Sequence, residues 1–235
     1  MHPVTLAPAA QLPPAGSSPA PKAGRPSVDE AAQLTQRIVA VATQLFVANG
    51  YAATSVDAIV RGAGISKKTL YARFADKAQV FDAVVESHVL RHLGTPQDDV
   101  SPTGTLQEQL NQVGARLLVG TLHADVLGIY RVAVAESLQF PQLMRKVFDA
   151  AVLRAVEQVE RLFLAGLAPP PDARQARQLA MHFMNCAISP PFYRAMQGLE
   201  PAGFDEARRA QLHTAIVYFL HGVLGVQGRS LQAAG

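Results

Sequence analysis

The chain has 235 residues, of which 49% are hydrophobic and 17% charged, and its formal net charge is +3. This length suits one small module joined to a larger one, with enough apolar surface for a sizeable core. No apolar run reaches the roughly 18 residues of a membrane span, and the proline-rich N-terminus does not resemble a secretory signal. The single cysteine, Cys186, excludes an internal disulfide. We therefore expect a cytoplasmic protein without a membrane partner.

The excess positive charge lies in the N-terminal part. Up to His92 there are nine Lys and Arg against six Asp and Glu, whereas from Leu93 onward there are twelve of each. This asymmetry favours a module that meets phosphate, joined to a neutral body with a different task.

Residues 1–26 are rich in Pro, Ala, Gly and Ser, which predicts a disordered arm. Lys22 and Arg25 make this arm basic, and it is either a solvated tail or a segment that lies along DNA. Ser27 with Glu30 has the spacing of a capping box and predicts the start of a first helix. That helix has one apolar face and ends at Asn49–Gly50, a dipeptide suited to a left-handed cap.

The stretch from Thr54 to Lys77 predicts two short helices joined by a tight turn. Thr54 is expected to cap a helix over about 55–63, and Gly64 suits a positive φ at the turn. Ser66 then caps a helix over 67–74, and Asp76 with Gln79 starts another over 77–93. A helix, a glycine turn and a short helix that opens with two lysines are the plan of a helix-turn-helix module.

These residues resemble a known family. GISKKTLYARFADKAQVF is similar to the recognition helix and following helix of TetR/AcrR transcriptional regulators, and RIVAVATQLFVANGYAATSVDAIVRGAG resembles the family's first two helices. RVAVAESLQFPQL and PFYRAMQG resemble the regulatory domain of the AefR-like type. The resemblance implies an all-α fold, with an N-terminal three-helix helix-turn-helix domain and a C-terminal helical bundle for ligand binding and dimerisation.

The expected organisation is an arm (1–26), a DNA-binding domain (27–93), a loop (94–104), a regulatory and dimerisation domain (105–228) and a flexible tail (229–235). Polar–apolar periodicity predicts that the regulatory domain is entirely helical. Ser189–Pro190–Pro191 is expected to interrupt one long helix. The predicted helices span about 105–122, 124–138, 141–165, 172–188, 191–198 and 205–224.

The first turn of the predicted recognition helix holds Lys67 and Lys68, where a lysine can donate to guanine O6/N7 or to phosphate. Thr69 suits a base edge or a thymine methyl, Tyr71 can donate its phenol to phosphate, and Arg73 can reach backbone or base. The alternative for each is a solvated surface group or a local cap. The complete set of candidate DNA contacts is Thr54, Ser55, Lys67, Lys68, Thr69, Tyr71, Arg73 and Lys77, of which Thr54, Ser55 and Lys77 are expected at phosphates near helix starts.

One such module binds DNA weakly, whereas two on a dimer read half-sites one or more helical turns apart. The resemblance implies a homodimer whose four-helix bundle uses the helices over 172–188 and 205–224. The second helix has an apolar stripe suited to burial against a partner, and the alternative is that the stripe faces its own core. The stripe consists of Leu212, Ala215, Ile216, Phe219, Leu220 and Val223.

The resemblance also implies a ligand pocket in the regulatory domain and release of the operator when a ligand favours a conformation with wrongly spaced heads. Methionine and aromatic side chains adapt to apolar ligands, so a small apolar or amphipathic effector is expected. The alternative for each candidate is ordinary core packing. The candidates are Leu117, Leu118, Tyr130, Val134, Met144, Phe148, Phe163, Met181, Met184, Phe192 and Tyr193.

No metal or other cofactor is expected. His88 and His92 have i,i+4 spacing but lack a third local ligand. Cys186, four residues after His182, has no resolving cysteine and is interpreted as a small hydrophobic residue. Arg131 and Glu136 are five residues apart and therefore do not share a helix face, so each is expected to contact another helix or a polar ligand group.

The sequence therefore predicts a DNA-binding transcriptional regulator, a ligand-released repressor that binds a palindromic operator as a dimer. One alternative is an enzyme or small-molecule carrier built on a helical domain, and another is a family member that acts without binding DNA. No glycine-rich phosphate loop, nucleophile elbow or carboxylate pair supports an enzyme. Lys67, Lys68 and Lys77 argue for retained DNA binding.

Overall fold

The computed structural model describes residues 28–94 and 104–232, and every regular element within those two ranges is helical. The predicted all-α fold is confirmed. The predicted arm over 1–26 and most of the predicted loop over 94–104 lie outside the described residues.

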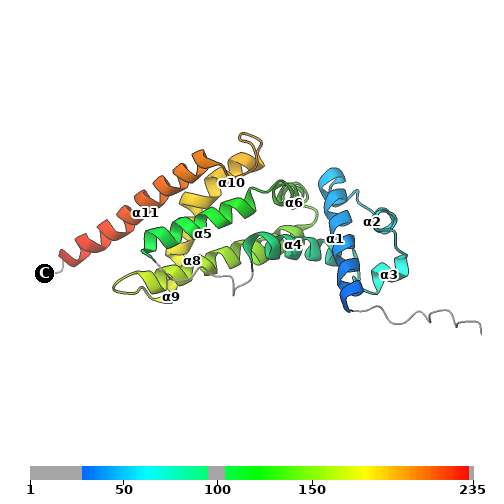
Figure 1. Cartoon of the computed structure of the whole chain (residues 1–235), viewed down its shortest axis with the longest axis horizontal. Helices are drawn as coiled ribbons and strands as arrows, with labels where there is room; N and C mark the ends of the chain where they lie inside the picture. Colours follow the sequence, from blue (N-terminus) through cyan, green and yellow to red (C-terminus); the bar gives the residue numbers. More distant parts are fainter. Residues whose placement is uncertain (1–27, 95–103, 233–235) are drawn as a thin grey trace, which may run out of the picture.

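The first three helices form a head at one end of an elongated molecule (Figure 1). They are α1 (Val28–Asn49), α2 (Val56–Ala63) and α3 (Lys67–Tyr71), and α4 (Lys77–Leu93) connects the head to the body. The apolar face predicted for the first helix is confirmed, because Ile38, Ala42 and Phe46 of α1 are fully buried. Val80, Phe81 and Val84 of α4 are fully buried as well. The rings of Phe46 and Phe81 pack with centroids 5.6 Å apart, which joins α1 to α4.

The start of α2 differs from the prediction by one residue. Ser55, not Thr54, is the N-cap, and its hydroxyl accepts from the Ala58 N–H at 3.1 Å. Thr54 is only 1% exposed, and its hydroxyl donates to the carbonyls of Gly50 at 2.7 Å and Leu45 at 3.1 Å. Thr54 therefore secures the chain reversal after α1 and cannot cap α2.

The turn between α2 and α3 has the predicted geometry. Gly64 has φ +63°, a left-handed conformation that costs a residue with a Cβ more than it costs glycine. Ser66 caps α3 by accepting from the Thr69 N–H, and Asp76 caps α4 by accepting from the Gln79 N–H. The helix-turn-helix thus follows from local chemistry at three short-range sites.

The body runs from α5 to α11, and α5 packs against α4, α8 and α11. The C-terminal end of α11 lies at the opposite end of the molecule from the head (Figure 1). In the described ranges no single helix is long and apolar enough to cross a membrane, and only α5 and α6, bent by 69°, pass that test as a pair. The body's elements are α5 (Leu106–Thr121), α6 (Ala124–Ala135), α7 (Pro141–Val147), η2 (Phe148–Val152), α8 (Leu153–Gly166), α9 (Ala173–Phe183), η3 (Met184–Ile188), α10 (Ser189–Met196) and α11 (Glu206–Gln232).

The body differs from the prediction at Ser189–Pro191 and at the end of its last helix, among other boundaries. Ser189–Pro190–Pro191 does not break the helix, because the prolines lie in the first turn of α10 and the preceding residues form the π-helical segment η3. The helix α11 continues to Gln232, past the predicted end at Leu224, so the predicted tail begins as helix. Residues 233–235 lie outside the described part.

Candidate DNA-binding surface and effector cavity

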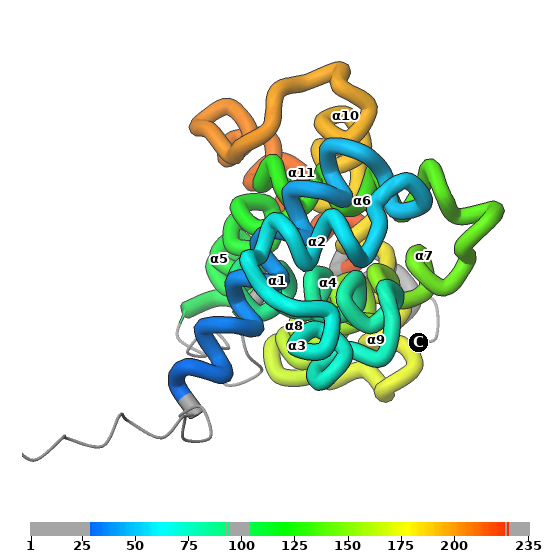
Figure 2. Tube along the Cα trace, turned by 90° about the vertical axis from the view of Figure 1, so that its right-hand side faces the viewer, coloured from blue at the N-terminus to red at the C-terminus, as the bar shows by residue number. Residues whose placement is uncertain are grey.

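The helices α2 and α3 lie in front of α4 when the molecule is viewed from the head along its long axis (Figure 2). On α3, Lys68 is exposed and Tyr71 is 51% exposed. Leu70, between them in sequence, is fully buried and anchors α3 to the head. Burial of Leu70 fixes the rotation of α3, which presents Lys68 and Tyr71 to solvent.

Three other candidates, in α3 or just after it, have partners inside the protein. Lys67 Nζ lies 2.7 Å from Asp57 Oδ1 of α2, and this hydrogen bond raises the pKa of Lys67. Thr69 Oγ1 shares a hydrogen bond of 2.8 Å with Ser66 Oγ at the helix cap, and Arg73 Nη1 donates to the Thr69 carbonyl at 3.4 Å. Because water screens the exposed pair of Lys67 and Asp57, that lysine can exchange its partner at little cost.

Lys77 also has internal partners, which corrects its expected role. Its Nζ donates to the carbonyls of Tyr51 at 2.7 Å, Thr54 at 2.9 Å and Ala52 at 3.2 Å. Partial burial lowers the pKa of Lys77, and the ammonium lies 4.3 Å from the centroid of the Tyr51 ring. Three donors with three acceptors leave no hydrogen for a phosphate. Lys77 holds the loop between α1 and α2, and the buried Thr54 is likewise unavailable to DNA in this structure.

The same loop contacts the body. Glu136, at the end of α6, accepts from the Ala52 N–H at 2.8 Å, and the Tyr51 ring packs against Phe140 with centroids 5.0 Å apart. Gly50 has φ +83°, a left-handed conformation that favours glycine, and a Cβ there would lie 3.0 Å from Glu136 Oε1. Sequence analysis left the partner of Glu136 open, and the structure identifies it as the head.

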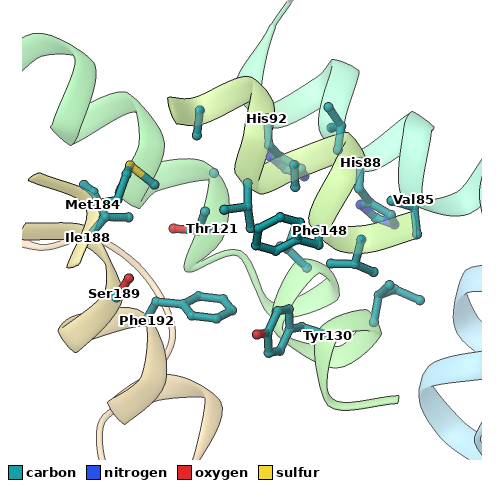
Figure 3. Close-up of a pocket in the computed structure, with 18 of the residues that line it drawn as sticks. Val85, His88, His92, Thr121, Tyr130, Phe148, Met184, Ile188, Ser189 and Phe192 are labelled. Atoms are coloured by element: carbon teal, nitrogen blue, oxygen red, sulfur yellow. The ribbon is translucent and has the colours of Figure 1, made fainter. Parts of the chain in front are cut away.

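A cavity of about 230 Å³ lies in the body between α4, α6, η2, η3 and α10. Figure 3 shows aromatic and aliphatic side chains from these elements directed toward a common space. Six of the eleven predicted pocket residues line it, namely Tyr130, Phe148, Met181, Met184, Phe192 and Tyr193.

The other five predicted pocket residues lie elsewhere. Leu117, Leu118 and Phe163 are at most 1% exposed and form core, Met144 packs beside that core, and Val134 is 42% exposed. Helical spacing identifies an apolar face but does not tell whether that face meets a neighbour or a void. These five residues are therefore removed from the pocket.

Sequence analysis missed much of the lining. Val85, His88, Val89 and His92 come from α4, the helix that follows the helix-turn-helix directly. The π-helical segments η2 and η3 contribute Ala151, Val152, Asn185 and Ile188, and further lining residues that were not predicted come from α5, α6, α7, α8 and α10. A π turn widens the helix locally and is frequent at functional sites. The only feature of the sequence that marked an irregular helix there was Pro190–Pro191 after η3, and it was interpreted as a break in the helix.

The cavity carries no formal charge near neutral pH. None of the described residues that line it is Asp, Glu, Lys or Arg. Burial lowers the pKa of His88 to about 4, and burial and the neighbouring His123 lower the pKa of His92. Burial, and interaction with the Tyr193 hydroxyl, raise the pKa of Tyr130 to about 12. Within the described ranges no three His, Cys, Asp or Glu side chains are grouped as a metal site.

The predicted dimer stripe on α11 faces largely inward. Leu212, Ile216 and Leu220 are at most 6% exposed and pack α11 against its own body, so the alternative interpretation holds for these three residues. Ala215, Phe219 and Val223 are half-buried, and Phe219 lies against Phe163 and Phe183. A different face of α11 is exposed, with Thr214, His221 and Tyr218, the last 72% exposed.

The helix-turn-helix head on a helical body defines a DNA-binding protein of the helix-turn-helix class. Comparison with known protein families identifies the family of each part of the chain. Residues 38–84 match the family described as bacterial regulatory proteins, tetR family, and residues 108–222 match the AefR-like transcriptional repressor C-terminal domain. The chain belongs to the TetR family and is a DNA-binding transcriptional regulator.

Individual relatives agree with this assignment. The DNA-binding transcriptional repressor TetR of Mycobacteroides abscessus is 30% identical over 135 residues, which are 52% of this chain and 68% of that protein. The flavonoid-responsive regulator FrrA has the same fold, with 24% identity, a TM-score of 0.63, and 81% of this chain and 97% of that chain covered. FadR of Bacillus subtilis, in complex with stearoyl-CoA, is 16% identical with a TM-score of 0.60, and 80% and 98% of the two chains are covered.

Proposed function

We propose that the protein is a cytoplasmic, homodimeric repressor that binds a palindromic operator and releases it when a small apolar or amphipathic effector enters the cavity. The observation that carries this proposal is the position of α4. It begins directly after the helix-turn-helix, holds the head loop through Lys77, and lines the cavity with His88 and His92. A ligand in the cavity therefore touches the same rigid helix that positions the head.

We further propose a division of the chain into two domains. Residues 27–93 would form the DNA-binding domain and residues 105–228 the regulatory and dimerisation domain. The DNA-contact set that we retain lies at the start of α2, along α3 and just after α3, and its residues are exposed or half-buried. It consists of Ser55, Lys67, Lys68, Thr69, Tyr71 and Arg73.

We place the dimer contact on the outward face of α11 around Thr214, Tyr218 and His221, together with the neighbouring exposed surface of α9. The apolar side of α11 packs against its own body. Among the described residues of α11, only those on the outward face are therefore free to contact a second copy of the chain. A tyrosine that is 72% exposed supplies large contact area at low entropic cost.

The contact of Glu136 and Phe140 with the loop between α1 and α2 couples the body to the head. A ligand that binds against Tyr130 and Phe148 meets α6 and η2, and between these elements lie Glu136 and Phe140. Operator release requires only that the ligand binds more tightly to a state in which these contacts have shifted.

Glu136→Ala should loosen the head loop. The Ala52 amide loses its acceptor, and because the bond is exposed, its loss is worth at most about 1 kcal/mol, or about fivefold faster hydrogen exchange at Ala52. Amide exchange measured by NMR at Ala52 checks this expectation. Ser137→Ala, one residue along, should leave the exchange rate unchanged. Equal protection of Ala52 in the wild type and Glu136→Ala would show that the bond does not hold the loop.

The function itself is tested on the DNA upstream of the chain's own gene. The purified protein should protect a palindromic site from nuclease digestion, with two protein chains bound per site. Compounds that bind the cavity should lower this protection. Absence of any protected site in the upstream region and in a genomic selection for bound fragments would reject the repressor.

A further inference from the structure

Two polar side chains in the cavity wall have no partner within the part of the chain that the structure describes. They are Asn185 of η3 and Ser189 of α10, which we call the polar pair. Asn185 is exposed and Ser189 is half-buried, so a small molecule in the cavity can reach both. Figure 3 shows the Ser189 hydroxyl directed toward the space between Thr121 and Phe192.

The other hydroxyl groups of the lining already have partners. The Thr121 hydroxyl donates to a backbone carbonyl of its own helix at 2.8 Å. The hydroxyls of Tyr130 and Tyr193 interact with each other. The ring nitrogens His88 Nδ1 and His92 Nε2 lack partners among the described residues, but both atoms are buried, which keeps a ligand from them. Among the hydroxyl and amide groups of the described lining, those of the polar pair are therefore the ones left for a ligand.

The π turn places the polar pair beside an aromatic wall. The Ser189 N–H bonds to the carbonyl of Met184, five residues earlier, so the helix is locally widened where Asn185 lies. Residues three or four apart are neighbours on a helix surface, with about 5–6 Å between their Cβ atoms. Asn185, Ser189 and Phe192 follow each other at these intervals and line the same cavity. A ring packed on Phe192 can therefore carry a substituent that reaches the pair.

The rest of the lining restricts the ligand further. Phe148, Phe192 and Tyr130 supply aromatic walls, with the rings of Tyr130 and Phe192 perpendicular and 4.8 Å apart. An apolar cavity of about 150 Å³ accepts benzene, so the 230 Å³ found here suits one to two rings. A carboxylate or phosphate would enter without a cation to pair with it, and a cation without an anion.

We propose that the effector is an uncharged aromatic compound of one to two rings with a neutral oxygen substituent, which the Ser189 hydroxyl and the Asn185 amide bind. The proposal rests on the proposed function only in taking this cavity as the effector site. A hydroxyl and an amide can each donate and accept, so the pair suits a phenol. Asn185 and Ser189 are then specificity-determining residues of the cavity, whereas the aromatic walls supply most of the contact area.

Three probes of matched shape test the ligand class by calorimetry on the full chain: 2-naphthol, naphthalene and 2-naphthoate. We expect 2-naphthol to bind about tenfold more tightly than naphthalene, because two hydrogen bonds of about threefold each are gained. We expect no measurable binding of 2-naphthoate, because its charge would be left unpaired. Binding of the anion as tightly as the phenol, or no binding of either neutral probe, would overturn the proposal.

The role of the polar pair is tested by Ser189→Ala and Asn185→Leu. Each variant should reduce the preference for 2-naphthol to about threefold, and the double variant should bind the two neutral probes equally. Naphthalene should bind to all three variants as it does to the wild type, which checks that the cavity is intact. Thr121→Val is the matched control, because the Thr121 hydroxyl already has a partner and its loss should leave the tenfold preference unchanged. A tenfold preference in the double variant would exclude the pair.

NMR on the wild-type protein tests the contact without relying on the affinity of a variant. The side-chain amide signals of Asn185, assigned by their absence in Asn185→Leu, should shift more with 2-naphthol than with naphthalene. Equal shifts with the two probes would overturn the contact. Operator binding is measured separately, so phenol binding at the polar pair without operator release would reject only the proposed release mechanism.

Discussion

Lys68→Ala on α3 is expected to weaken operator binding by about 1–3 kcal/mol in each half-site, and therefore by about 2–6 kcal/mol in a dimer. The side chain is exposed in the first turn of a helix whose rotation is fixed by the buried Leu70. If Lys68 contacts a base edge, its replacement should relax the sequence preference at one position of each half-site. If Lys68 contacts a phosphate, its replacement should instead weaken binding to all sequences. It should also reduce the slope of log affinity against log salt concentration by about one per lost contact. Binding isotherms at several salt concentrations, on the operator and on single-position variants of it, separate the two contacts.

Arg145→Ala provides the matched control for Lys68. Arg145 is exposed on α7 in the body, and its replacement removes the same unit of charge. Operator affinity should change little, since a distant exposed charge is screened by salt. If both variants lost the same affinity, the loss would report net charge, and α3 would not be the helix that reads the operator.

Tyr51→Ala is expected to lower the free energy of unfolding by about 3–5 kcal/mol, the range for removal of a large buried aromatic side chain. The ring is 4% exposed and packs against Phe46 and Phe81 of the head and α4, with centroids 5.5 and 5.6 Å away, and against Phe140 of the body. Its removal opens a cavity where head, α4 and body meet. Urea unfolding followed by circular dichroism measures the change.

Tyr51→Phe separates packing from the hydroxyl. It retains the ring contacts, so its unfolding free energy should lie within about 1 kcal/mol of the wild type. Operator affinity should follow the same order, with Tyr51→Ala impaired and Tyr51→Phe close to normal, because the loop over 50–54 positions α2. A small stability loss in Tyr51→Ala would show that head and body pack independently at this ring.

The two predictions concern different requirements for DNA recognition. Lys68 supplies a contact, whereas Tyr51 holds the element that supports the contacts. A repressor of this kind needs both, because a head that moves freely pays the cost of ordering at each binding event. The Glu136 and Lys77 bonds to the same loop supply the polar part of that restraint.

The sequence by itself determined the head. Each signal there was local: Ser66 and Asp76 as caps, Gly64 at a positive φ, and apolar residues at helical intervals in α1 and α4. Such signals depend on residues within about one turn of each other, so they can be recognised without knowledge of the tertiary structure. The family resemblance drew on the same residues, and the family matches include them.

The tertiary structure decided which of the recognised residues face outward. Lys77 and Thr54 have the right chemistry for phosphate, but in the folded protein both side chains donate their hydrogen bonds to backbone carbonyls of the loop after α1. The stripe of Leu212, Ile216 and Leu220 is apolar whether it packs against a partner or its own body, and only the packing of α11 distinguishes the two. The cavity depends on two π turns and on His88 of the neighbouring α4, a long-range arrangement. Side-chain type and spacing are properties of the sequence, whereas burial and voids arise from the packing of segments far apart in the chain, and that packing made the cavity.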